Sequence, residues 1–191
     1  MAKKIPDELK EAILQLPEKE KDKLLIRLIG KDSTLIKKLR HQLLEDEVDM
    51  EAMRNELIKG ATSLFSREDF HHWTYTPGLL MMVLRDFSGA IGRHVKITKD
   101  KYGEVILLVL LVNLPFRKQF AILYENQHRA DKFADYVCKK AQTALKKLQK
   151  LDRDYYLEFD KDVNEMLDHL KTYPPTSRLM STYNLPATWE Y

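Results

Sequence analysis

A one-sided run of charge lies between residues 139 and 153, where six basic side chains stand with one acidic one. On a helix these basic residues fall opposite the apolar row that contains Val137 and Leu148, so we expect them to form an exposed face. Such a face can attract a phosphate backbone, which makes a nucleic-acid-associated accessory factor one hypothesis for function. The lysines concerned are Lys139, Lys140, Lys146, Lys147 and Lys150.

The segment that follows has the opposite sign. Residues 154–168 hold six acidic side chains and one lysine. If the two segments are antiparallel neighbours, the acidic flank offsets the basic one. A charge run is typical of a solvated helix face, so nucleic-acid binding is the alternative hypothesis and not the leading one.

Two Glu-x-x-His tetrads, Glu68–His71 and Glu125–His128, have the spacing that places a carboxylate and an imidazole on one helix face. Ferritin-like bundles use such pairs in di-metal sites, together with a Glu from each of two further helices. The sequence nominates no such further Glu, and Glu68 lies where the helical pattern fails. We therefore expect no metal and no other cofactor.

The segment Gly89-Ala90-Ile91-Gly92 resembles the Gly-x-x-Gly loop with which KH domains clamp RNA. Its two middle residues are apolar and would bring no charge to phosphate, so close helix packing is the favoured interpretation. Cys138, the single cysteine, flanks an apolar row and is expected to be an inert small hydrophobe. No Ser-His-Asp order, Walker loop or nucleophile elbow occurs, which favours a role that is not enzymatic and leaves any activity unassigned.

The composition is that of a folded domain. The chain has 191 residues, of which 44% are hydrophobic and 32% charged, with a net charge of +3. These values exclude disordered, collagen-like and disulfide-scaffold chains. The longest apolar run, Val105–Val112, has eight residues, whereas a membrane span needs about 20. The first residues lack the apolar segment of a secretory signal, so we expect a cytoplasmic protein without membrane association.

Apolar spacing of three and four residues predicts an all-α fold, a compact array of short antiparallel helices. Residues 1–65 are expected to form N-terminal helical hairpins that could stack like a short α-solenoid. Residues 66–76 are expected to be an irregular loop, and residues 77–173 a C-terminal helical region that begins at the cap-plus-proline pair Thr76-Pro77. We expect these parts to form one continuous domain.

The stretch 94–112 admits two interpretations. Thr98 could cap a helix that leads into Val105–Leu114, or residues 94–98 and 104–112 could be the strands of a small hairpin, giving an α+β fold. Four of the eight residues in Val105–Val112 are β-branched, which favours a strand. The length of the segment and its helical neighbours favour a helix, which we predict.

Residues 174–191 follow the last helical pattern and are rich in large apolar side chains. A free tail would not carry them, so we expect the tail to dock on its own helices or on a second molecule. Tyr183 and Trp189 are the candidate partner contacts, because aromatic residues concentrate binding energy. The leading hypothesis is a helical protein-interaction or scaffold protein that binds a protein partner or itself.

Overall fold

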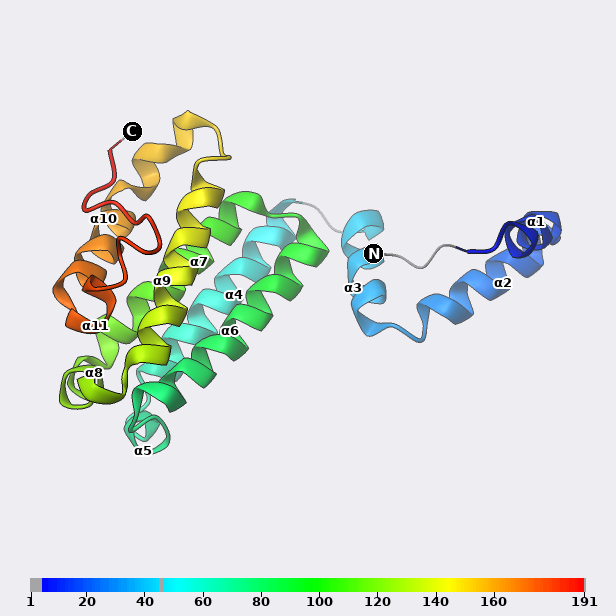
Figure 1. The fold of residues 1–191 in the computed structure, drawn as a ribbon. Coiled ribbons are helices and arrows are strands. Elements are labelled where there is room, and N and C mark those ends of the chain that lie inside the picture. Colours follow the sequence, from blue (N-terminus) through cyan, green and yellow to red (C-terminus); the bar gives the residue numbers. More distant parts are fainter. Residues whose placement is uncertain (1–4, 45–46, 191) are drawn as a thin grey trace. The chain divides into compact units, whose positions relative to one another are not determined.

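A computed structural model describes residues 5–44 and 47–190, and the regular elements within those ranges are all helices, without a strand. The predicted all-α class is therefore confirmed. The chain divides into two units, Met1–Leu44 and Glu45–Tyr191, here called the N-terminal and C-terminal units. Figure 1 shows their helices. No helix among the described residues has both the length and the apolar character needed to cross a membrane.

The N-terminal unit consists of three helices separated by local stop signals. Gly30 closes the second helix and Asp32 caps the third, since the Asp32 carboxylate accepts a hydrogen bond from the Leu35 N–H at 3.1 Å. The second and third helices contact each other. The three helices are α1 (Asp7–Gln15), α2 (Glu18–Ile29) and α3 (Ser33–Leu44).

The C-terminal unit holds the longer helices. They are α4 (Glu47–Phe65), α5 (Phe70–Trp73), α6 (Pro77–Thr98), α7 (Lys101–Lys118), α8 (Phe120–Glu125), α9 (Asp131–Leu148), α10 (Tyr156–Thr172) and α11 (Pro174–Ser177). The sequence grouped α4 with the helices before it, as part of residues 1–65. In the structure α4 packs on α6 and α7, and the boundary between the units lies before it.

Helix α7 is the centre of the C-terminal unit. Helices α4, α6, α9 and α10 all pack against it, and Leu111–Phe116 are buried without interruption. A helix surrounded on all sides needs no polar face, so its sequence shows a continuous apolar run instead of a 3.6-residue period. Val105–Leu114 is thus helical as predicted, and the hairpin over 94–112 does not form.

Helices α9 and α10 both pack on α7, and each buries one apolar row. On α9 the row from Phe133 to Leu148 is buried, and on α10 the row from Phe159 to Leu170 is buried. Helix α10 packs mainly on α7 and less on α9. Its acidic side chains Asp162 and Glu165 bind Arg117 of α7, at 2.8 and 2.5 Å, instead of the lysines of α9.

Three local predictions differ from the structure. The Gly-x-x-Gly segment lies within the unbroken helix α6, as the favoured interpretation expects, and forms no RNA-clamping loop; however, its glycines do not serve close helix packing, since a Cβ atom would meet nothing within 4 Å at Gly92 and only the Arg93 side chain at Gly89. Thr98 belongs to the end of α6, and Asp100 caps α7 in its place. Pro174-Pro175 starts the short helix α11, because proline suits a first helical turn.

The tail docks on the helices of its own unit. Tyr183 donates its hydroxyl to Asp135 of α9, and its carbonyl accepts a hydrogen bond from Gln142 at 2.7 Å. Trp189 is 9% exposed, donates its backbone N–H to Asn164 Oδ1 at 2.8 Å, and packs edge-on against Tyr156. Both predicted anchors are therefore engaged within the molecule, and Trp189 presents little surface to a partner.

Leu148 is fully buried at the end of α9. We predict that Leu148→Ala lowers the free energy of unfolding by about 2–5 kcal/mol, because it removes apolar contacts and leaves a cavity. Lys146→Ala, on the exposed side of the same turn, should change it by less than about 0.5 kcal/mol. Urea denaturation of both variants measures the difference, and equal effects would show that the helical phase of α9 is wrong.

The docked tail gives a second prediction. Trp189→Ala should destabilise the protein by about 3 kcal/mol and speed chymotrypsin cleavage after Tyr183, because the aromatic anchor of the tail is lost. Glu190→Ala, at an exposed neighbouring residue, is the control and should leave the stability and the cleavage rate unchanged. A cleavage rate that does not respond to Trp189→Ala would contradict the docking described above.

Candidate functional site

A hollow of about 480 Å³ lies where the turn between α6 and α7 meets the end of α9. Five of its lining side chains are lysines and one is a glutamate, so its net charge is strongly positive. Its apolar lining comes from Gly92 and Val95 of α6 and from Leu151, just after α9. We call this hollow the lysine pocket, and its charged residues are Lys96, Lys99, Lys101, Glu104, Lys147 and Lys150.

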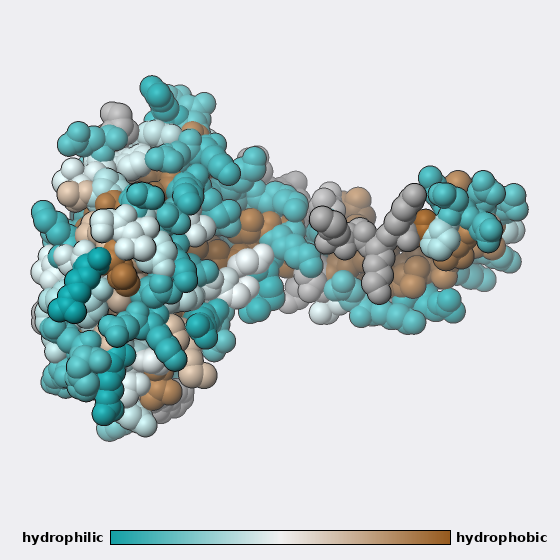
Figure 2. All heavy atoms as spheres, viewed as in Figure 1, coloured by the Kyte–Doolittle hydropathy of each residue, from teal (hydrophilic) through white to brown (hydrophobic). Residues whose placement is uncertain are grey.

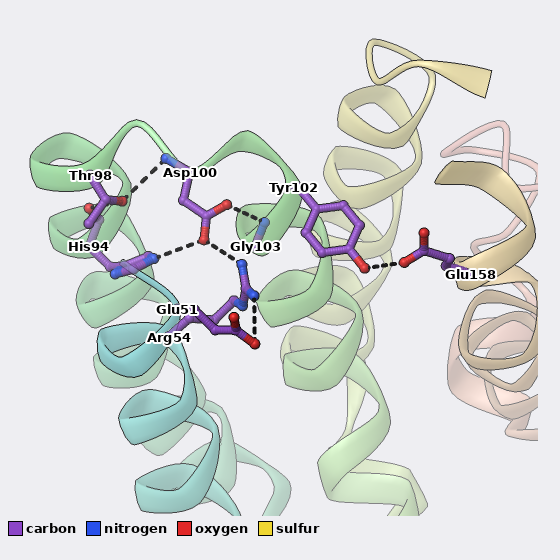
Figure 3. Close-up of polar contacts among 8 residues, drawn as sticks. All are labelled: Glu51, Arg54, His94, Thr98, Asp100, Tyr102, Gly103 and Glu158. Atoms are coloured by element: carbon purple, nitrogen blue, oxygen red, sulfur yellow. Dashed lines mark hydrogen bonds and ion pairs between the residues drawn. The ribbon is translucent and has the colours of Figure 1, made fainter. Parts of the chain in front are cut away.

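The turn that carries Lys99 and Lys101 is fixed by the buried Asp100 between them (Figure 3). Asp100 Oδ1 accepts the Gly103 N–H at 2.7 Å, which caps α7. The other oxygen accepts a hydrogen bond from Arg54 Nη1 of α4 at 2.9 Å and lies 3.4 Å from His94 Nε2 of α6. The Asp100 carboxylate thereby links α4, α6 and α7 at the turn that carries the two lysines.

The backbone of the turn is held as well. The Asp100 N–H donates to the Thr98 hydroxyl at 3.2 Å, and that hydroxyl donates to the His94 carbonyl at 2.9 Å. Lys99, which closes α6, adopts a left-handed conformation with φ 61°. Glycine or asparagine is the usual residue at such a position, so a lysine there carries a backbone cost of roughly 1 kcal/mol.

Hydrogen bonding decides the charge state of Asp100. Burial by itself raises the pKa of this carboxyl, but hydrogen bonds from His94, the Gly103 N–H and Arg54 outweigh burial and hold the pKa below its usual range. The contribution of Asp100 to stability is therefore present above its ordinary pKa and is lost as the pH falls through the lowered value. At neutral pH Asp100 is a carboxylate that Arg54 neutralises.

The glycine at 103 is required by this cluster. A Cβ atom at this position would lie 1.9 Å from Asp100 Oδ2 and 2.6 Å from Arg54 Cδ. A side chain at position 103 would therefore displace the Asp100 carboxylate from the Gly103 N–H, with which it forms a hydrogen bond.

The pocket joins only part of the predicted basic face. Lys147 and Lys150 line it, and Lys147 binds Glu104 at 2.8 Å. Lys139 binds Asp135 at 2.8 Å, and Lys140 donates to the Ser88 hydroxyl at 2.6 Å. Burial lowers the pKa of Lys140. Lys146 is exposed and does not line the pocket, so the five predicted lysines do not act as one surface.

Sequence reasoning missed the other half of the pocket. Lys96, Lys99 and Lys101 stand within six residues of one another, at a helix end followed directly by a helix start. The close spacing of these three lysines is visible in the sequence. Because residues 94–112 could form either a helix or a hairpin, the spacing did not indicate that the lysines face the end of α9.

The remaining sequence candidates give no site. Glu125 ends α8 and His128 lies in a separate 3₁₀ turn, Gln127–Arg129, so they do not share a helix face. The side chain of His71 lies outside the described residues. Within the part of the chain that the structure describes, no group of three or more His, Cys, Asp or Glu could hold a metal ion. Burial, with a smaller effect of Asp135, raises the pKa of Cys138 to about 12, so its thiol is unreactive.

A second hollow of about 360 Å³ lies among α4, α7 and α10. Aliphatic and aromatic side chains form its apolar walls, and it includes the buried Asn113, whose Oδ1 has no hydrogen-bond partner among the described residues. Its charged side chains are already paired: Arg117 binds Asp162, and Glu158 accepts a hydrogen bond from Tyr102. This hollow therefore offers less unbalanced charge to a ligand than the lysine pocket does.

The N-terminal unit presents a different kind of surface. No described side chain between residues 5 and 44 is buried, although each helix carries a row of large apolar residues. Leu25 and Leu28 of α2 are 57% and 52% exposed, and Leu43 of α3 is 75% exposed. Figure 2 shows this hydrophobic surface in brown along the unit. We call Leu9, Leu25, Leu28, Ile36 and Leu43 the apolar stripe; other large apolar side chains of the unit are exposed as well, namely Ile5, Leu14, Ile26 and Leu44.

Comparison with other proteins adds no assignment: no known protein family, curated protein or solved structure matches this chain.

The Asp100 cluster predicts the effect of a single methyl group. Gly103→Ala should lower the free energy of unfolding by about 1–3 kcal/mol, because the displaced carboxylate leaves buried partners unsatisfied. Gly60→Ala in α4, where a Cβ meets nothing within 4 Å, is the matched control and should raise stability by up to about 1 kcal/mol. Thermal denaturation of both variants tests this, and a Gly103→Ala variant as stable as the control would exclude the anchoring role.

Proposed function

We propose that this chain is a cytoplasmic protein-interaction protein whose N-terminal unit pairs with the N-terminal unit of a second copy. The observation that carries the proposal is the apolar stripe. Soluble proteins rarely leave a continuous row of large apolar side chains in water unless it meets a partner. Burying each such leucine contributes about 1.5–3 kcal/mol, so a few of them suffice to drive association.

The N-terminal unit also lacks what a small unit needs to be stable alone. Chains of roughly 40 residues usually depend on disulfides, metals or oligomerisation. The single cysteine, Cys138, lies in the C-terminal unit, so a disulfide within residues 5–44 is impossible. Among the described residues no group of three or more His, Cys, Asp or Glu could hold a metal ion, so association is the means of stabilisation that we propose. A reduced, buried thiol is consistent with the cytoplasm.

Charge supports a second copy as the occupant. Residues 5–44 hold nine Lys and Arg against seven Asp and Glu; the acidic residues all lie between Asp7 and Asp32, whereas α3 carries only basic ones. A near-neutral surface of mixed sign does not repel its own copy and can form reciprocal ion pairs across a two-fold axis. The C-terminal unit, by contrast, buries its own apolar rows in its own core.

Sedimentation equilibrium of the full chain, over about 1 to 100 µM, tests the proposal. We predict an average mass that rises from monomer toward dimer with concentration. Leu25→Gln with Leu28→Gln should weaken the dimer at least about tenfold, because two apolar contacts are lost from each copy.

Lys19→Gln with Lys23→Gln is the matched control. Both lysines are exposed on the opposite side of α2, so this pair should change the dissociation constant by less than about threefold. A monomer at every concentration would overturn the proposal and would leave either the C-terminal unit or a different protein as the cover of the stripe. Equal weakening by both pairs would also overturn it, since the stripe would then not be the interface.

A further inference from the structure

We propose that the lysine pocket binds a small molecule that carries two or more phosphate groups. The inference is independent of the proposed self-association, since the pocket lies wholly within the C-terminal unit. Its first support is unbalanced charge. Among the described residues no ion pair is formed by Lys96, Lys99, Lys101 or Lys150, and Lys147 has the only carboxylate of the pocket, Glu104, as its partner.

Charges of one sign that line a concave surface reinforce one another. A pocket with low-dielectric walls focuses the field and concentrates counter-ions of opposite sign. Lysine ammonium groups are point charges that bind phosphate oxygens from several directions. Because the pocket carries five ammonium groups and one carboxylate, a ligand with a single phosphate would leave most of the charge unmatched.

The helix below the pocket adds to the same field. Lys101 and Glu104, in the first turn of α7, line the hollow, so the positive end of an 18-residue helix lies at its edge. A helix N-terminus stabilises anions through its dipole, although the Gly103 N–H is not available to a ligand because Asp100 already accepts it. The lysines and the helix end thus favour the same kind of ligand.

The pocket is also preorganised. The Asp100 cluster fixes the turn through α4, α6 and α7, so Lys99 and Lys101 keep their positions without a ligand. Lys99 adopts a left-handed conformation with a backbone cost, and its side chain forms no hydrogen bond or ion pair with the described residues that would offset this cost. A lysine at this position is accounted for if its ammonium group binds a ligand.

Size and shape favour a small molecule over a nucleic-acid backbone. A volume of about 480 Å³ lies within the range of small-molecule sites, and Val95 and Leu151 supply an apolar wall beside the charges. The predicted basic face that nucleic acid would need is divided, because Lys139 and Lys140 have partners of their own. A nucleoside diphosphate matches both the charged and the apolar parts of the lining.

Isothermal titration of the full chain at low salt, with ADP, AMP and inorganic pyrophosphate as probes, tests the inference. We expect one ADP per chain, with pyrophosphate also bound and AMP bound at least about tenfold more weakly. The double variant Lys99→Asn, Lys150→Gln should weaken ADP binding at least about tenfold. Asparagine at 99 keeps the left-handed turn while removing the charge, so unchanged thermal stability shows that folding is preserved.

Lys146→Gln with Lys161→Gln removes the same charge from exposed positions outside the pocket and is the matched control. It should change ADP affinity by less than about threefold. The inference is overturned if neither ADP nor pyrophosphate binds below about 1 mM, or if both double variants weaken binding equally. Tighter binding of a single-stranded oligonucleotide than of ADP, weakened also by the control pair, would overturn it in favour of a nucleic-acid surface.

Discussion

The burial of most of α7 is the constraint on which the C-terminal unit depends. A helix whose residues from Leu111 to Phe116 all leave water must be covered by neighbours, and α4, α6, α9 and α10 provide that cover. The apolar rows of these neighbouring helices then face α7. Because Asp100 caps the start of this helix and also holds Arg54 and His94, the apolar core and the polar turn are fixed together.

The same constraint explains how a polar pocket can be rigid. Lysine side chains are long and flexible, so the ammonium groups of a surface lysine cluster usually have no fixed positions. Here Lys99 and Lys101 flank a buried carboxylate, and Lys147 and Lys150 extend from the end of a helix whose Leu148 is in the core. The charged side chains therefore start from fixed backbone positions.

Part of this arrangement could be predicted from the sequence. The rows of α9 and α10 have helical spacing and one buried face, and that spacing predicted their burial. Thr76-Pro77 marked the start of α6, and Gly30 and Asp32 marked the ends of helices in the N-terminal unit. For α7 the periodicity gave no answer, because a helix with no exposed face has no polar stripe; its length and neighbours decided it.

The pocket and the unit boundary could not be predicted in this way. Lys96 and Lys150 are 54 positions apart in the sequence and lie beside one hollow only because α6 and α9 pack together. Periodicity also gave the first three helices apolar rows like those of the core helices. Periodicity could not show that these rows remain exposed. Burial depends on whether other helices cover a row, and the spacing of the apolar residues is the same in either case.

The contrast between the two units can be measured directly, because the proposal requires that the C-terminal unit is stable by itself and that the N-terminal unit is stabilised by association. Hydrogen–deuterium exchange of the full chain at a low and a high concentration reports on both units in one experiment. We predict that amide protection in α2 rises with concentration while protection in α7 stays the same. Protection in α2 that is independent of concentration, or already equal to that of α7 in the dilute sample, would contradict the account.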